Sequence, residues 1–107
     1  MRRLGQVIRV RPESIAEYER LHANPWLEVN AAIRRANIRN YSIFRFGELL
    51  FAYLEYVGDD FAGDMVAMAD DPDVRRWLAL TDALQVPYPE RAPGDWWLSL
   101  SEVFHTD

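Results

Sequence analysis

Tyr18 and His22 are the two side chains of this sequence whose types and spacing best suit the movement of protons. They stand four residues apart, so in a helix they lie on one face with their Cβ atoms about 5–6 Å apart. An imidazole titrates near neutral pH and can give or take a proton, whereas a phenol can donate a hydrogen bond. Pro25 and Trp26 follow, and we expect them to turn the chain and close a pocket with an aromatic ring. The pattern predicts proton-transfer chemistry that uses neither a metal nor a cofactor.

Three further side chains could bind a small polar substrate beside this pair. Tyr41 is expected near the start of a strand, where pairing with another aromatic ring across the sheet is the ordinary alternative. Trp77 lies at helical spacing among apolar residues, so it fits either a core position or a platform for the C–H face of a sugar. Arg76 is expected to face solvent, from where it could donate hydrogen bonds to hydroxyl groups. For His22 itself, the alternative is an ordinary histidine at the end of a helix.

Several classes of function lack their sequence signals. The chain has no cysteine, no set of residues with metal-ligand spacing, and no G-x-G-x-x-G, P-loop or G-x-S-x-G motif. Its net charge of −5 disfavours nucleic acid as a partner. No apolar run is long enough to span a membrane, and no secretory signal is apparent at the start of the sequence. We therefore expect a cytoplasmic protein without a membrane or nucleic-acid partner.

Hydrophobic periodicity indicates which elements must position these side chains. Apolar and polar residues alternate along strands, whereas apolar residues recur every three or four positions along helices. Pro25 breaks the helix that carries Tyr18 and His22, and Gly47-Glu48 joins two strands. Asp71-Pro72 is expected to divide a long helix, with Asp71 as its cap. The expected strands are 3–11, 38–46, 49–57 and 96–104, the expected helices are 13–23, 26–36 and 59–83, and 86–94 is an expected loop.

This order of elements predicts one α+β domain over residues 1–107 with a ferredoxin-like βαββαβ fold. Four antiparallel strands would carry the helices on one face of the sheet, as in the dimeric α/β-barrel type. The opposite face would still present many apolar side chains. Such a face needs a cover, so we expect a homodimer.

The chain resembles the L-rhamnose mutarotases over essentially its whole length. The resemblance rests on fragments whose order and spacing match that family: Glu17-Tyr18, Arg20-Leu21-His22, Asn24-Pro25-Trp26, Asn40-Tyr41-Ser42-Ile43, Leu49-Leu50-Phe51-Ala52, Arg76-Trp77, Thr81-Asp82 and Glu102-Val103-Phe104. The chain departs from the family pattern in two places. Arg76 stands where the first of two tryptophans is expected, and the hairpin between the middle strands is shorter than in some relatives.

The resemblance implies a small dimeric enzyme with His22 as the acid–base residue, Tyr18 and Tyr41 in contact with a sugar, and aromatic or polar contacts at Arg76 and Trp77. The reaction would interconvert the α and β anomers of L-rhamnose or a related aldose by ring opening and closure. In our hypothesis His22 gives a proton to the ring oxygen. Tyr18 or Tyr41, or a water that they hold, receives or relays the anomeric proton.

Two alternatives come from other classes of protein. One is a ferredoxin-like dimeric monooxygenase or cyclase that acts on an aromatic substrate in the same pocket. The other is a non-catalytic small-ligand-binding dimer in which His22 is only a polar part of the pocket wall. Oxygen consumption would distinguish the first alternative, and binding without turnover would distinguish the second.

Overall fold

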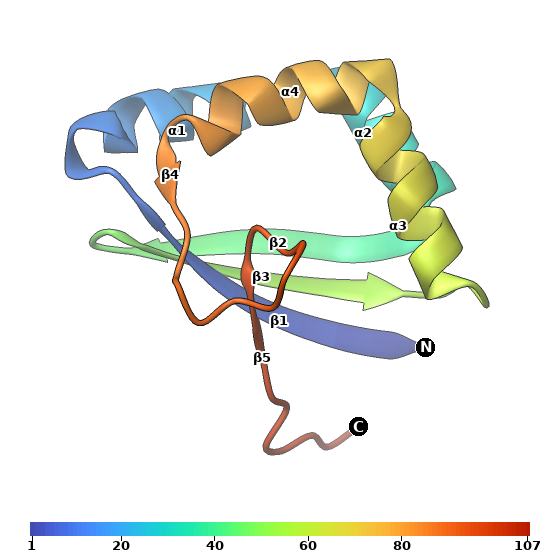
Figure 1. Cartoon of the computed structure of the whole chain (residues 1–107). Coiled ribbons are helices and arrows are strands. Elements are labelled where there is room, and N and C mark those ends of the chain that lie inside the picture. Colours follow the sequence, from blue (N-terminus) through green and yellow to red (C-terminus); the bar gives the residue numbers. More distant parts are fainter.

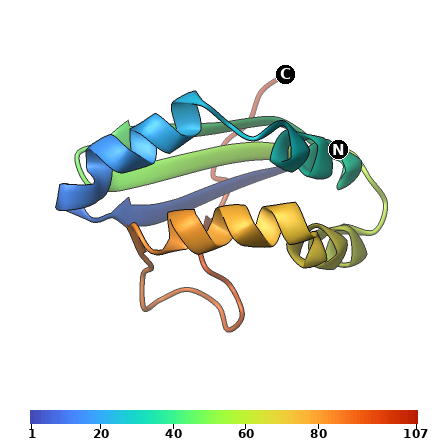
Figure 2. The same ribbon diagram turned by 90° about the horizontal axis from the view of Figure 1, so that it is seen from above.

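The structure, a computed structural model, describes all 107 residues as an antiparallel sheet with a layer of helices on one of its faces (Figure 1). The expected ferredoxin-like α+β fold is confirmed. Seen from above, α1 and α2 follow one another over one side of the sheet, and α4 and α3 cover the other (Figure 2). The elements are β1 (Arg2–Val10), a 3-10 turn (Pro12–Ser14), α1 (Ile15–Ala23), α2 (Leu27–Arg35), β2 (Ile38–Phe46), β3 (Leu49–Tyr56), α3 (Phe61–Asp70), α4 (Pro72–Asp82), β4 (Gln85–Val86) and β5 (Leu98–Leu100).

The strands are ordered β2-β3-β1-β4, and all neighbours are antiparallel. This order places β1 in the middle of the sheet, between the β2–β3 hairpin and the last strands. The core lies between the sheet and the helices, in two clusters of buried residues. They are Ile8, Val10, Tyr18 and Leu50, and Ala36, Ile38 and Leu54. None of the helices is long and apolar enough to cross a membrane.

The fourth strand of the fold differs from the prediction, because it consists of two short pieces along the same edge of β1. Gln85–Val86 lies opposite Val10 and Arg9, and Leu98–Leu100 lies opposite residues 7 to 5. Residues 87–97 leave the sheet between the two pieces. Three prolines in this segment lack the backbone N–H that a strand needs for its ladder of hydrogen bonds.

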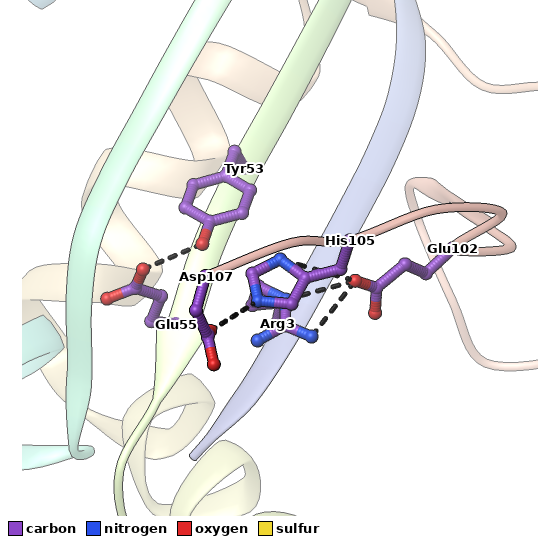
Figure 3. A network of polar contacts seen from close by, with 6 residues as sticks. All are labelled: Arg3, Tyr53, Glu55, Glu102, His105 and Asp107. Carbon is purple, nitrogen blue, oxygen red and sulfur yellow. Dashed lines mark hydrogen bonds and ion pairs between the residues drawn. The ribbon is translucent and has the colours of Figure 1, made fainter.

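The prediction of one continuous strand over 96–104 is therefore wrong at both ends. After Leu100 the chain leaves the edge of β1 and passes to the face of the sheet away from the helices, where the C-terminus lies (Figure 1). Glu102 forms an ion pair with Arg3 at 3.0 Å on that face (Figure 3).

The helices begin and end within about two residues of the expected bounds, except that residues 12–14, at the expected start of the first helix, form a 3-10 turn. Asp71 accepts hydrogen bonds from the backbone N–H groups of Asp73 and Val74, and Pro72 takes the first position of α4. The predicted division at Asp71-Pro72 is confirmed. The break between α1 and α2 spans residues 24–26, so the predicted effect of Pro25 is confirmed as well.

Candidate functional site

A cleft of about 860 Å³ lies between the helices and the β2 side of the sheet. Its walls come from the end of α1, from α2, β2 and α4, and from single residues of neighbouring elements. The cleft is lined by His22, Pro25, Trp26, Val29, Asn30, Ile33, Arg34, Ile38, Arg39, Asn40, Tyr41, Ile43, Glu55, Val57, Met68, Val74, Trp77 and Leu78. Most of this wall is apolar or aromatic, and its polar groups are few, which is typical of a site for a small molecule.

The last turn of α1 places His22 at the cleft with one ring nitrogen already occupied. Its Nδ1 lies 2.8 Å from the backbone carbonyl oxygen of Tyr18, one turn earlier. A carbonyl oxygen can only accept, so Nδ1 carries the hydrogen and donates it. In the neutral ring Nε2 then keeps its lone pair and is free to accept a proton.

The surroundings of His22 favour its neutral form. Burial of the ring lowers its pKa below the usual value, and the hydrogen bond with the Tyr18 carbonyl opposes this shift only in part. A neutral imidazole with a free Nε2 acts as a base near pH 7. The ring is half-buried, so a substrate in the cleft can still reach it.

Aromatic rings hold the imidazole on two sides. The ring of Tyr18 stacks on His22 with centroids 4.1 Å apart, and Trp77 meets His22 edge-on at 5.2 Å. Trp26, which follows the break after α1, meets Trp77 edge-on at 5.2 Å. Trp77 is only 9% exposed, so it is part of the core and part of the cleft wall at once. The ring of Trp26 closes the cleft where the sequence predicts it.

Tyr41 reaches the cleft because β2 is irregular. The pairing of β2 with β3 shifts between Arg39 and Ser42, so the residues after the bulge face the opposite side from the one that strict alternation gives them. Asn40 takes the left-handed conformation at φ 51°, which asparagine tolerates better than most residues, and its side-chain amide donates to Glu55 at 2.7 Å. Although 37% of the Tyr41 surface is exposed, desolvation of its hydroxyl raises its pKa to about 12, so its phenol stays neutral at pH 7 and can donate a hydrogen bond.

Tyr18 lies behind His22 and is not part of the cleft wall. It is 3% exposed, and its hydroxyl accepts a hydrogen bond of 3.3 Å from the Gln85 side chain. Burial raises the pKa of Tyr18 well above its usual value, and the neighbouring phenol of Tyr41 adds to the shift. The structure therefore gives Tyr18 a place below the imidazole, where it supports the ring.

Arg76 does not reach the cleft. It points away on α4 and forms an exposed ion pair with Asp73, one turn earlier on the same helix. Of the residues singled out in the sequence, the structure thus brings His22, Tyr41 and Trp77 together at one cleft. It places Tyr18 directly behind them and leaves Arg76 outside.

Sequence reasoning missed the polar groups that α2 contributes. Asn30 and Arg34 line the cleft together with Trp26, at spacings of four residues along one helix face. Their spacing of four and eight residues from Trp26, within the expected helix 26–36, could have indicated both. Gln85 was missed for a different reason, because its contacts come from segments distant in the sequence. No group of three or more His, Cys, Asp or Glu side chains is arranged to hold a metal ion.

The fold and the cleft together define a ferredoxin-like α+β protein whose site suits proton transfer on a small polar molecule. The chain belongs to the L-rhamnose mutarotase family, because the sequence model with that description matches residues 3–106. This membership confirms the resemblance found in the sequence. The L-rhamnose mutarotase of Lactiplantibacillus plantarum is 33% identical over an alignment that covers 100% of both chains. That of Ligilactobacillus salivarius is 34% identical, with 98% of this chain and 97% of the relative covered.

Two solved structures share the fold. The crystal structure of an L-rhamnose mutarotase from Formosa agariphila has a TM-score of 0.77 at 22% identity, covering 100% of both chains. Tetracenomycin F2 cyclase from Streptomyces glaucescens, a type-II polyketide cyclase, has a TM-score of 0.61 at 20% identity, covering 99% of this chain and 96% of the cyclase. At these identities both structures show the fold alone, and the family rests on the sequence matches.

Proposed function

We propose that this chain interconverts the α and β anomers of L-rhamnose. The observation that carries the proposal is the state of His22, with Nδ1 donating to the Tyr18 carbonyl at 2.8 Å and a lowered pKa that leaves Nε2 unprotonated. Membership of the L-rhamnose mutarotase family supports the choice of sugar. The likeness to a cyclase concerns only the fold, so the cyclase or monooxygenase alternative is not favoured.

Ring opening requires that the anomeric hydroxyl lose a proton and that the ring oxygen gain one. In the proposed reaction, Nε2 of His22 takes the proton of the anomeric hydroxyl. The bond between C1 and the ring oxygen breaks, and C1 becomes an aldehyde carbon. Both oxygens are bonded to C1, so the imidazolium can return the same proton to the ring oxygen. Rotation about the C1–C2 bond and the reverse steps on the other face of the aldehyde give the second anomer.

The hypothesis from the sequence has a tyrosine, or a water that it holds, receive the anomeric proton, whereas in this proposal His22 receives it. The raised pKa values of Tyr18 and Tyr41 keep both phenols protonated, so neither is suited to receive the anomeric proton. A neutral His22 is suited to receive it. In this proposal Tyr41 donates a hydrogen bond to a sugar oxygen. The faces of Trp26 and Trp77 contact the apolar C–H groups and the methyl group of the deoxy sugar.

Saturation transfer between anomeric protons in NMR tests the proposal, with L-rhamnose beside a panel of other aldoses. We expect exchange of L-rhamnose anomers well above the uncatalysed rate, and slower exchange of sugars that lack its methyl group. An L-rhamnose exchange rate equal to that of buffer would refute the proposed function. Binding of the sugar without exchange would then favour the non-catalytic ligand-binding alternative.

We also propose that the chain pairs with a second copy through the sheet face away from the helices. Phe44, Phe46 and Phe51 are 65%, 77% and 39% exposed, and the register of β2 with β3 places all three on that face. In the segment after β5, Val103 and Phe104 are 94% and 78% exposed. Apolar groups gathered in this way mark an association surface, and a second copy offers a matching apolar surface.

Polar contacts set the position of the C-terminal segment on this face. Arg3 binds Glu102, and His105 lies between Glu102 and Asp107 (Figure 3). The ion pairs leave the neighbouring apolar side chains free for a partner. Light scattering at micromolar concentration should give the mass of a dimer, and Phe44→Asp should give a monomer. A wild-type monomer would refute the pairing.

A cytoplasmic location is a further proposal. The lack of cysteine suits a reducing compartment, because no disulfide can contribute to the fold. Fractionation of cells that express the protein at its natural level tests it, and recovery outside the cytoplasm would refute it.

A further inference from the structure

Gln85 is a buried side-chain amide behind the cleft, only 4% exposed, and the proposed mechanism gives it no role. It lies in β4 opposite Val10, whose side chain belongs to the core between sheet and helices. Both ends of its amide are hydrogen bonded. The indole N–H of Trp96 donates to Oε1 at 2.8 Å, and Nε2 donates to the hydroxyl oxygen of Tyr18 at 3.3 Å.

Trp96 determines which way this amide points. An indole nitrogen can only donate, so the amide oxygen of Gln85 has to face it. The amide NH₂ group then has to face Tyr18. The Tyr18 hydroxyl therefore accepts a hydrogen bond from Gln85, and its own O–H is left to donate in another direction.

We infer that Gln85 and Trp96 are positioning residues that fix the Tyr18 hydroxyl as a donor toward the site and hold its ring against the imidazole. The ring of Tyr18 stacks on His22 at 4.1 Å, and its backbone carbonyl accepts from Nδ1 of the same imidazole. Tyr41, which lines the cleft, and Asp82 on α4 are both near enough to Tyr18 to raise the pKa of its hydroxyl, with Tyr41 having the larger effect. One buried amide thus sets the orientation of a side chain in contact with the proton-exchanging ring.

The interruption of the fourth strand between β4 and β5 is what brings Trp96 next to Gln85. Residues 87–97 leave the sheet after β4 and return at β5, next to the place where they left. This excursion brings Trp96 back against the core cluster of Ile8, Val10 and Tyr18. A continuous fourth strand would pass Gln85 without returning an indole to its side chain.

The inference rests on the proposed function, and Gln85→Leu tests it directly. Leucine fills most of the same volume but neither accepts from Trp96 nor donates to Tyr18. We expect kcat for L-rhamnose anomer exchange to fall roughly threefold to tenfold, the range of one lost hydrogen bond. KM should change by less than about twofold, because Gln85 lies outside the cleft wall. Trp96→Phe should lower kcat in the same direction, whereas Trp97→Phe is the matched control.

Gln85→Glu gives a readout that a merely structural role would not produce. A carboxylate only accepts, so it would draw the Tyr18 O–H toward itself and away from the site. A protonated carboxyl group restores both the donor for Tyr18 and the acceptor for Trp96. Burial raises the pKa of such a carboxyl group. We expect the activity of Gln85→Glu relative to wild type to rise as the pH falls from about 8 to about 6, in the range where burial places the variant's titration.

Charged neighbours on both sides act on this titration. Asp82 on α4 disfavours a second carboxylate, and its own pKa is raised by burial. Two guanidinium groups lie on either side of position 85, because Arg9 donates to the carbonyl oxygen of Pro87 and Arg11 donates to that of Ala83. Their positive charges favour the ionised form of a carboxyl group at position 85. The matched control is Gln6→Glu, a half-buried glutamine of β1 with the same change of charge. Its activity relative to wild type should stay level over this pH range.

Two results would overturn the inference. One is an unchanged kcat in a folded Gln85→Leu protein, and the other is a level pH profile for Gln85→Glu. If the wild-type protein exchanges no anomers, the proposed function fails, and the inference is then decided by NMR. The ¹³Cζ resonance of Tyr18 should move in Gln85→Leu and titrate in Gln85→Glu. A resonance that stays in place in both variants would refute the inference by itself.

Discussion

Replacing His22 by alanine should slow the exchange of L-rhamnose anomers by about 10²–10⁴-fold, or about 3–5 kcal/mol in activation free energy. The structure offers no substitute for its Nε2 at the cleft. The phenol of Tyr41 has a pKa of about 12 and is protonated at neutral pH. Hydrogen bonds from Tyr53 and Asn40 lower the pKa of the Glu55 carboxyl group, which makes its carboxylate a weak base.

The same substitution should leave the protein folded. It removes a stacked contact with Tyr18 and an edge contact with Trp77, at centroid distances of 4.1 and 5.2 Å. Aromatic pairs of this kind contribute about 0.5–1.5 kcal/mol each. A domain of this size has a free energy of unfolding of about 5–15 kcal/mol, so the protein should remain folded after this loss. Circular dichroism and thermal unfolding measure this part of the prediction.

The assay is NMR saturation transfer between the anomeric protons of L-rhamnose, at equal concentrations of folded wild-type and His22→Ala protein. His105→Ala is the control, because that imidazole lies on the other face of the sheet (Figure 3). We expect the control to exchange anomers at the wild-type rate. A folded His22→Ala protein that exchanges them as fast as wild type would refute the role of Nε2 and the reasoning from the hydrogen bond of Nδ1.

Three further predictions follow from the same site. Wild-type kcat/KM should stay level from about pH 8 to below 6.5 and fall only at lower pH, because burial lowers the pKa of His22. The lowered pKa also means that the folded state binds fewer protons than the unfolded state, so the free energy of unfolding decreases as the pH falls through about 6.5. In thermal melts at acid pH, His22→Ala should therefore lose less stability than wild type does. Arg76→Ala should change kcat/KM by less than about twofold in the same assay, because its exposed ion pair with Asp73 lies outside the cleft. Asn40→Val should lower the free energy of unfolding by about 1–3 kcal/mol in denaturant titrations and should raise KM, because valine is strained at φ 51°. Glycine tolerates this conformation, so Asn40→Gly should keep Tyr41 in place.

The fold could be predicted because most of its signals are local. Alternating and helical patterns follow from one segment at a time, and the cap at Asp71 followed by Pro72 sets a helix start without any tertiary contact. The fourth strand could not be predicted in the same way. Its two pieces are recognisable as one strand only through their pairing with β1, which is distant in the sequence.

In the candidate site too, the contacts within one helix could be predicted, and those that depend on pairing or packing could not. Tyr18 and His22 belong to one helix, so their spacing predicts their contact, and the structure has them stacked. Tyr41 depends on a bulge that no pattern of apolar residues reveals, because the shift in register arises between two strands. Arg76 and Trp77 are adjacent in the sequence but point to different sides of α4, and only packing decides which of them reaches the cleft.

The half-buried position of His22 balances two opposing requirements of a base at neutral pH. Deeper burial would lower its pKa further and weaken it as a base, and it would also close the ring off from a sugar. Greater exposure would let water solvate the imidazolium and would keep more of the ring protonated. The stack on Tyr18 and the edge of Trp77 cover two sides of the ring, while the hydrogen bond of Nδ1 holds the tautomer whose basic nitrogen is Nε2. The break at Pro25 makes this balance possible, because a helix that continued past Ala23 would carry Trp26 away from Trp77, the ring that covers His22.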